Sequence, residues 1–280
     1  MAIEDYRARV ETAMGRFIEE LGEKNGLRDA CEYALMNGGK RLRPILVLMI
    51  GEALGKGLDV MPVALSVEFF HTASLIADDL PCMDNDDVRR NRPSLHKAVG
   101  ESVAILASYA LIAEGYGGIY RNGSVKNATV LCLEAATRCA GIRGATNGQF
   151  LDLYPPSASL ESIQKIIYQK TVTLFEISFV FGWLFGGGEE EKLKQVQMCA
   201  YHLGMAFQIA DDLLDNLQDA EQESAINIVA ACGREKALAL FEAEMFAFTA
   251  SLKELGLWTE PFQEVVEWLW RYSTPEPVRV

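Results

Sequence analysis

A long apolar run that ends in acids decides the fold: residues 63–79 read VALSVEFFHTASLIADD. Its apolar side chains recur at three- and four-residue spacing, which is typical of a buried helix. The same period is found in residues 45–54, 103–113, 130–140, 162–185, 191–217 and 235–255. Alternating segments of the β type are scarce, and glycine- or proline-containing turn signals separate the helical runs. The sequence therefore predicts an all-α protein of several long, mostly buried helices, with residues 1–280 forming a single domain.

The composition excludes several classes of function. Of 280 residues, 50% are apolar and 23% are charged, which is an ordinary globular composition. The 39 acidic and 26 basic residues give a net charge of −13, so we expect no nucleic-acid partner and no binding to anionic membrane surfaces. The longest apolar stretch, Val172 to Phe185, is too short to span a bilayer. Six scattered cysteines and no signal-peptide pattern favour a reducing, cytoplasmic location.

Two acidic clusters follow apolar helical runs, where a solvated charged face is unexpected. Residues 75–90 read LIADDLPCMDNDDVRR, and residues 207–215 read FQIADDLLD. Crowded carboxylates repel one another unless a cation neutralises them. Carboxylates without cysteine or paired histidine suit Mg²⁺, which binds one or two carboxylates together with substrate phosphates. One such cluster could equally be a helix cap or a solvated surface, but two clusters with basic motifs nearby favour a metal–diphosphate site.

The helical period predicts which residues of the second cluster share a face. Asp211 and Asp215 are four residues apart, so they differ by about 40° around a helix. Gln208 lies three residues before Asp211 and joins the same stripe.

The first cluster needs a break in its helix. Asp78 and Asp84 would lie about 120° apart on an ideal helix, and Pro81 cannot continue a regular hydrogen-bond ladder. We therefore predict a bulge or a helix end that brings Asp84 round towards Asp78. His71, seven residues before Asp78, should lie on the same face as Asp78, about 20° away.

A basic motif complements the acids: residues 37–44 read NGGKRLRP. A glycine pair lets backbone approach an anion, and Lys40, Arg41 and Arg43 supply positive charge just before a helix expected to begin near Pro44. Alone, this motif could be a solvated basic turn. It is not a P-loop, because the GxxxxGK[ST] spacing is absent from the sequence.

In these motifs the sequence resembles the trans-isoprenyl diphosphate synthases of the polyprenyl synthetase family. The resemblance runs from about Asn37 to Asp215. The matching residues are, in order, Gly38 to Pro44, Asp78-Asp79 with Asp84 and Arg89-Arg90, Gly148-Gln149 with Asp152, Lys170-Thr171, and Phe207-Gln208 with Asp211-Asp212 and Asp215. The resemblance implies a helical bundle of the isoprenoid synthase type around a central cavity. It also implies a Mg²⁺-dependent prenyltransferase that joins isopentenyl diphosphate to dimethylallyl, geranyl or farnesyl diphosphate.

The resemblance assigns a role to each matching side chain. The expected Mg²⁺ ligands are Asp78, Asp84 and Asp211, which would hold roughly three ions with diphosphate bound, and the supporting acids are Asp79, Asp212 and Asp215. The expected contacts of the allylic substrate are Arg89, Lys170, Thr171 and Gln208. The expected contacts of isopentenyl diphosphate are Lys40, Arg43, His71 and Arg90. His96 and His202 are interpreted as structural.

Product length should depend on what lies below Asp78 along its helix. Ala73 lies about 7.5 Å down the axis, and Ser74 is also small. In the family that the sequence resembles, an aromatic side chain at the position of Ala73 tends to stop growth at fifteen carbons. The next bulky residues, Phe70 and Phe69, lie about 12–13.5 Å down. We therefore expect the C20 product, geranylgeranyl diphosphate, with farnesyl diphosphate as the alternative.

Departures from the family pattern leave other functions open. After Asp215 the usual glycine- and lysine-rich loop is replaced by NLQDAEQESAIN at residues 216–227, which has three acids and no lysine. Ala77 and Asn91 also replace a larger residue and a glycine. A weakly active or regulatory subunit of a heteromeric synthase is therefore one alternative to an active homodimeric enzyme. A class I terpene cyclase is another, although a second DDxxD argues against it.

Overall fold

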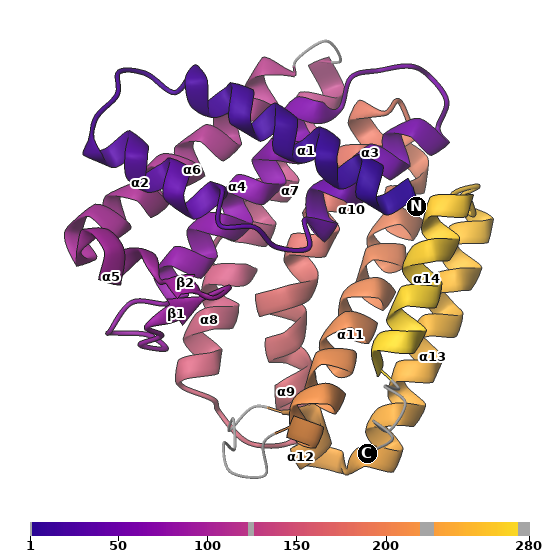
Figure 1. Ribbon diagram of the computed structural model, residues 1–280. Helices are drawn as coiled ribbons and strands as arrows, with labels where there is room; N and C mark the ends of the chain where they lie inside the picture. The colour runs from indigo at the N-terminus through magenta and orange to yellow at the C-terminus, as the bar shows by residue number, and fades with distance from the viewer. Residues whose placement is uncertain (1, 123–125, 219–226, 274–280) are drawn as a thin grey trace. The chain divides into compact units, whose positions relative to one another are not determined.

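The computed structural model describes residues 2–122, 126–218 and 227–273. The chain divides into two compact units, and each is described by itself. The first unit comprises Met1–Ala136 and Phe181–Gly187, and the second comprises Thr137–Val180 and Gly188–Val280. Both consist almost entirely of helices (Figure 1). The all-α fold predicted from the sequence is therefore confirmed, whereas the single domain stays a prediction.

Among the described residues, the first unit is built from six complete helices, a short hairpin, most of a seventh helix and the end of α10 (Thr173–Phe185). Besides this end of α10, they are α1 (Ala2–Glu19), α2 (Gly26–Leu35), α3 (Leu42–Ala53), α4 (Met61–Asp78), β1 (Val88–Arg89), β2 (Arg92–Pro93), α5 (Leu95–Val99), α6 (Glu101–Arg121) and most of α7 (Lys126–Ala140). The two strands pair antiparallel, with Arg89 opposite Arg92. The hairpin follows the first aspartate-rich motif and returns the chain towards α5.

Helices α4 and α6 run side by side and form the core of the first unit (Figure 1). Small residues on α6 allow this approach, because a Cβ at Gly115 would collide with the ring of Phe70. On the other side of α4, Phe69 packs against Phe17 of α1, with their ring centroids 4.6 Å apart. Helix α3 also contacts α4 and is almost completely buried. These contacts fix α4, the helix that ends at the first aspartate-rich motif.

The second unit contains the later motifs. Its elements are α8 (Ala145–Leu153), α9 (Leu160–Ile167), the π-helix η1 (Tyr168–Val172), most of α10 (Thr173–Phe185), the 3₁₀-helix η2 (Glu190–Lys192), α11 (Leu193–Gln218), α12 (Ile228–Cys232), α13 (Arg234–Glu254) and α14 (Glu260–Ser273). Helix α11 packs against α13 and α14. Phe179 lies in this core, with ring centroids 6.3 Å from Phe248 and 6.4 Å from Phe262.

The helical run predicted over residues 162–185 is continuous but not uniform. It begins as α9, passes through the π-helical turn η1 and continues as α10. A π-helical turn carries one extra residue per turn and is frequent at functional sites. Here the turn contains Lys170 and Thr171, two of the residues expected to contact the allylic substrate.

One helix among the described residues, α6, is long and apolar enough to span a membrane by length and composition, and 39% of its most apolar window is buried. Its inner face packs on α4 in the core of the first unit. The other face is exposed and apolar, a feature that bears on the oligomeric state proposed below.

Candidate functional site

The first aspartate-rich motif is a helix end followed by a tight turn. Helix α4 ends at Asp78, and the N–H of Asp79 still donates to the carbonyl of Leu75 at 3.1 Å. The chain then turns through Pro81, and the N–H of Asp84 donates to the carbonyl of Asp78 at 2.9 Å. This bond confirms the prediction that a helix end near Pro81 brings Asp84 back to Asp78.

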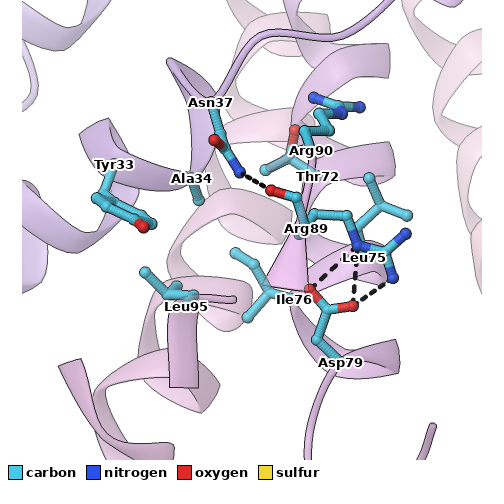
Figure 2. Close-up of a pocket in the computed structure, with 10 residues that line it drawn as sticks. All are labelled: Tyr33, Ala34, Asn37, Thr72, Leu75, Ile76, Asp79, Arg89, Arg90 and Leu95. Atoms are coloured by element: carbon cyan, nitrogen blue, oxygen red, sulfur yellow. Dashed lines mark hydrogen bonds and ion pairs between the residues drawn. The ribbon is translucent and has the colours of Figure 1, made fainter. Parts of the chain in front are cut away.

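The buried carboxylate of Asp79 forms an ion pair with the half-buried side chain of Arg89. Nε of Arg89 lies 2.9 and 3.2 Å from the two carboxylate oxygens of Asp79, and its Nη2 also contacts this carboxylate (Figure 2). A longer contact of 3.3 Å joins Arg89 to Asp86. The hydrogen bond to Asp79 raises the pKa of Arg89, although burial of the side chain opposes the rise. Asp79 and Arg89, expected to serve a metal and a substrate respectively, thus also bind each other.

A pocket lies beside this ion pair in the first unit. Helix α4 contributes Asp79 and the apolar residues Leu75 and Ile76 to its lining (Figure 2). Asn37 enters from the end of α2 and donates from Nδ2 to the carbonyl of Arg89 at 3.0 Å. The other lining residues are Tyr33, Ala34, Thr72, Arg90 and Leu95. The lining therefore contains Asn37 of the basic motif after α2 and the arginine pair Arg89 and Arg90 of the hairpin.

Arg41 behaves differently from its neighbours in the basic motif. Its side chain is buried, and its Nη1 lies 2.5 Å from the carboxylate of Glu68 on α4, which is also buried. Its Nη2 donates to the carbonyl of Leu35 at 2.5 Å. Arg41 is paired with Glu68 inside the unit, so it adds to the positive potential at His71 without being exposed to contact an anion itself. The apolar run around Glu68 gave no sign of which cation would pair with it.

His71 lies within a cluster of arginines. Its Nε2 is 3.4 Å from Nη1 of Arg43. Burial lowers the pKa of His71 well below the usual value, and the charges of Arg43, Arg90, Arg41 and Arg89 lower it further. The imidazole is therefore neutral at pH 7, and the positive potential here suits an anion such as a diphosphate. Arg43, His71 and Arg90, which the sequence grouped as one subsite, share this part of the first unit.

The glycine pair before Lys40 makes room for the side chain of Arg90. Nη1 of Arg90 donates to the carbonyl of Gly38, and a Cβ at Gly39 would collide with the Arg90 guanidinium. Both glycines have positive φ, 77° for Gly38 and 116° for Gly39. Lys40 is exposed at the end of this turn.

Replacing Gly39 with alanine is expected to displace Arg90 and to raise KM for isopentenyl diphosphate by about tenfold, the effect of losing roughly 1.4 kcal/mol of binding. Gly38→Ala is the control for a methyl group in the same turn, because Gly38 also has positive φ but its Cβ would meet no atom within 4 Å. Steady-state kinetics of both variants provide the comparison. Equal KM values in the two variants would contradict a role for the Arg90 position.

The product-length residues lie in the α4–α6 core. Ala73 is buried, and its carbonyl accepts a hydrogen bond of 3.0 Å from the hydroxyl of Ser108 on α6. Ser74 is half-buried and donates to the carbonyl of His71 at 2.8 Å. Phe70 is buried edge-on against Tyr116, with a centroid distance of 5.1 Å. The small residues Ala73 and Ser74 thus lie between Asp78 and the buried ring of Phe70, whereas Phe69 packs against Phe17 of α1, and the role of these residues in product length stays a prediction.

In the second unit, two glycines accommodate the π-helical turn. A Cβ at Gly148 of α8 would overlap the backbone of Lys170, and one at Gly204 of α11 would crowd the Cα of Val172 at 2.9 Å. Nζ of Lys170 lies 2.5 Å from Asp152, an acid that the sequence placed in a motif without giving it a role. The glycine and the acid of this motif thus position one turn of helix.

A hydrogen-bond chain starts at this turn. The hydroxyl of Thr171 donates to Oε1 of Gln208 at 2.9 Å, and Nε2 of Gln208 donates to Oδ1 of Asp212 at 3.0 Å. Oδ2 of Asp212 accepts from the N–H of Ile228 at 2.8 Å. Asp212 is buried, whereas Asp211 is half-buried on the adjacent position of α11. The helix continues to Gln218, so Asp211 and Asp215 share a helix as predicted, but the side chain of Asp215 lies outside the described part.

The donor set fits Mg²⁺ by its chemistry. Asp78, Asp84 and Asp211 offer only oxygen ligands, and the first two are joined by the backbone bond described above. Among the described side chains, no three acidic, histidine or cysteine groups form a complete metal cage. Mg²⁺ is usually bound by one or two carboxylates together with substrate phosphates rather than by an all-protein cage. The predicted meeting of the two aspartate-rich motifs stays a prediction, because the two units are described separately.

A family model described as polyprenyl synthetase matches residues 24–226, which include both aspartate-rich motifs. This chain belongs to the polyprenyl synthetase family. Members of this family are generally Mg²⁺-dependent. The residues that carried the resemblance, from the basic motif to the second aspartate-rich motif, all lie within the matched range.

Relatives within the family have several products in their names. The farnesyl diphosphate synthase of Geobacillus stearothermophilus is 38% identical over 79% of this chain and 76% of its own length. The large subunit 2 of a heterodimeric geranylgeranyl pyrophosphate synthase from Arabidopsis thaliana is 36% identical over 78% of this chain. The match spans only 60% of that plant protein. A geranyltransferase crystal structure from Legionella pneumophila superposes with a TM-score of 0.85, at 29% identity and over 96% of this chain and 95% of that one.

Proposed function

We propose that this polyprenyl synthetase family member is a prenyltransferase that condenses isopentenyl diphosphate with allylic diphosphates. Its product is a short-chain trans-prenyl diphosphate, and geranylgeranyl diphosphate fits best. The observation that carries the proposal is the family match over residues 24–226, which spans both aspartate-rich motifs. Relatives named as farnesyl and geranylgeranyl diphosphate synthases support the same class of substrates.

In the first unit, the arginine cluster around His71 binds isopentenyl diphosphate. Arg43 and Arg90 supply fixed positive charge, and Lys40 adds an exposed ammonium at the glycine turn. The neutral imidazole of His71 offers a hydrogen bond to a phosphate without a further charge to desolvate. Arg89 contacts the allylic diphosphate while Asp79 holds its guanidinium in place.

Asp78 and Asp84 of the first unit, and Asp211 of the second, are the Mg²⁺ ligands, with Asp215 in support. Roughly three ions accompany the diphosphate. When bound, Mg²⁺ neutralises charge on the diphosphate and makes it a better leaving group. In the second unit, Lys170 contacts the allylic diphosphate, and the oxygen of Thr171, supported by the Gln208 oxygen that accepts its proton, stabilises the positive charge that develops on the allylic carbon.

The reaction then needs little further chemistry from the protein. As the allylic carbon–oxygen bond breaks, the double bond of isopentenyl diphosphate attacks the allylic cation, and the departing diphosphate takes the released proton. Positioning of the two substrates supplies much of the rate, because it removes the entropic cost of their encounter. An apolar lining keeps water from the cation.

The full-length chain, incubated with Mg²⁺, labelled isopentenyl diphosphate and each allylic diphosphate in turn, tests this proposal. Linear chain growth is the expected result. A cyclic hydrocarbon would overturn it in favour of a terpene cyclase. Absence of product without an added partner subunit would overturn it in favour of a regulatory role.

The regulatory role is a second candidate because of one sequence feature. Residues 216–227 carry three acids and no lysine, where the family usually supplies lysines that meet the allylic diphosphate. Residues 219–226 of this segment lie outside the described part of the chain. A relative named as the large subunit of a heterodimeric synthase makes a heteromeric assembly a concrete alternative.

Product length gives a direct prediction. Ala73→Tyr is expected to shift the main product from C20 to C15, because a phenol ring would fill the space between Asp78 and Phe70. Ala98→Tyr, the same change at an exposed position of α5, is the matched control and should leave product length unchanged. Chromatography of the labelled products measures their chain length. Thermal unfolding shows whether both variants fold. A C20 product from folded Ala73→Tyr would contradict the assignment.

A homodimer is the proposed assembly, formed through the outward face of α6. Leu106, Tyr109, Ala113 and Tyr120 are exposed and lie within about 60° of one another around the helix. Contiguous exposed apolar faces of this kind mark protein interfaces. A cytoplasmic location is also proposed, supported by six cysteines that are all free.

Tyr109→Glu is expected to convert the dimer to a monomer at micromolar concentration, because it places a charge in the apolar face. Ile142→Glu is the control, since Ile142 is 80% exposed in the second unit and is not on α6. Sedimentation velocity measures both. A wild-type monomer, or a Tyr109→Glu dimer, would count against this interface.

A further inference from the structure

Asp212 lies at the end of the hydrogen-bond chain that starts at Thr171, and it fixes the direction of that chain. The N–H of Ile228 can only donate, and it donates to Oδ2 of Asp212 at 2.8 Å. The other oxygen, Oδ1, accepts from Nε2 of Gln208 at 3.0 Å. Both carboxylate oxygens of Asp212 are thus acceptors, and the amide nitrogen of Gln208 is the donor of the second bond.

The orientation of the Gln208 amide follows from this. Because its nitrogen faces Asp212, its oxygen faces Thr171 and accepts the hydroxyl proton at 2.9 Å. A hydroxyl has one proton, so that of Thr171 is committed to Gln208. The Thr171 oxygen can therefore present only lone pairs to a substrate.

This direction matters for a reaction that passes through a cation. An oxygen that presents lone pairs stabilises a positive charge, whereas an O–H group pointing the other way opposes it. We propose that Asp212 is a positioning residue that makes Thr171 an electron-pair donor towards the allylic cation, rather than a carboxylate that supports the metal. The inference rests on the proposed function and deepens it.

The surrounding structure keeps this chain in place. Gly148 and Gly204 allow α8 and α11 to approach the π-helical turn that carries Thr171. Asp212 is buried, and Asn227 caps α12 by accepting from the N–H groups of Val229 at 2.8 Å and Ala230 at 3.2 Å. The Ile228 donor is therefore held by the cap, and the carboxylate cannot turn without losing a buried hydrogen bond.

Asp212→Asn tests the proposal because it is isosteric and reverses the chain. The Ile228 N–H requires the oxygen of the introduced amide, so the NH₂ of that amide must face Gln208. Gln208 then turns its own oxygen towards this NH₂ and its own NH₂ towards Thr171, which frees the Thr171 proton to point at the substrate. The expected result is a fall in kcat of about 10²-fold, with KM for isopentenyl diphosphate and the Mg²⁺ requirement unchanged.

A double-mutant cycle with Thr171→Val separates this effect from others. In the Asp212→Asn background, Thr171→Val should cause no further loss of kcat. The Thr171 oxygen of that variant already points its proton, rather than its lone pairs, at the substrate. Additive losses, or a raised Mg²⁺ requirement, would overturn the proposal and place Asp212 with the metal. Glu244→Gln, which alters a carboxylate bound to His202 at 2.6 Å in the same unit, is the matched control and should leave kcat unchanged.

A binding measurement tests the same idea without turnover. An allylic diphosphate analogue with an ammonium nitrogen in place of the cationic carbon should bind Asp212→Asn about tenfold more weakly than wild type. The thiolodiphosphate analogue, whose hydrocarbon part carries no positive charge, should bind both equally. Equal losses for the two analogues would overturn the inference while leaving the proposed function intact. A wild-type chain that makes no product would count against the function, and the analogue comparison would still decide the role of Asp212.

Discussion

Replacing Asp78 with alanine is expected to lower kcat by about 10³-fold or more. The Mg²⁺ bound to the allylic diphosphate would lose a protein ligand, so the charge that develops on the leaving group would be stabilised less. Asp78 is the last residue of α4, and its carbonyl already holds the N–H of Asp84 at 2.9 Å. Removing its carboxylate therefore leaves this backbone hydrogen bond of the turn in place. The Mg²⁺ concentration needed for half-maximal activity should rise in parallel. Asp211→Ala should behave in the same way.

A nearby acid provides the control for charge. Asp87 lies in the same acidic segment, but its exposed side chain pairs with Lys97 at 2.7 Å. Asp87→Asn should leave both kcat and the Mg²⁺ requirement within a factor of about two, since exposed ion pairs contribute little. Measurement of initial rates over a Mg²⁺ series distinguishes the variants. Full activity in Asp78→Ala, or a loss of the same size in Asp87→Asn, would defeat the assignment of the metal ligands.

The sequence predicted the features that follow from local geometry. The helical period located 63–79 closely, against the observed Met61–Asp78, but the run predicted over 103–113 ends eight residues before Arg121, where α6 ends. Pro81 was sufficient to predict the end of α4 and the return of Asp84, because a proline cannot continue the ladder. The motifs also grouped candidate site residues within each unit, and the roles of these residues stay predictions.

Features that depend on contacts between distant segments could not be predicted in this way. Asp79 follows Asp78 directly in the sequence. Only the folded hairpin shows that the guanidinium of Arg89 is hydrogen-bonded to the carboxylate of Asp79. The chain from Thr171 through Gln208 to Asp212 joins positions up to 41 residues apart, and no local pattern marks it. The π-helical turn could not be predicted from the sequence either, because it depends on close packing against glycines of other helices.

Glu68→Leu is expected to destabilise the protein by about 3–5 kcal/mol, because it leaves Arg41 as a buried charge whose remaining acidic neighbour, Glu11, lies 4.0 Å from Nε. The two side chains are almost inaccessible, with exposed fractions of 1% for Arg41 and 2% for Glu68, and 2.5 Å separates Nη1 from Oε1. At this chain length the loss corresponds to a melting temperature lower by roughly 10 °C. Thermal and urea unfolding measure it.

The double variant Arg41→Met, Glu68→Leu separates two contributions to the loss of stability. One is the loss of the ion pair, and the other is the cost of burying the charge of Arg41 without Glu68. The double variant should recover part of the stability, because two apolar side chains of similar volume replace the pair, although the carbonyl of Leu35 loses its donor at about 1–3 kcal/mol. Glu267→Gln is the exposed control. It breaks an ion pair with Arg271 at 2.9 Å and should cost no more than about 0.5 kcal/mol.

The position of this pair links stability to substrate binding. Arg41 directly follows the glycine turn and Lys40, and it adopts a left-handed backbone conformation with φ of 52°. A residue other than glycine holds this conformation only when its surroundings enforce it. Glu68→Leu should therefore also raise KM for isopentenyl diphosphate in the fraction that remains folded, whereas Glu267→Gln should not. An unchanged KM together with a large loss of stability would show that the turn is held without Arg41.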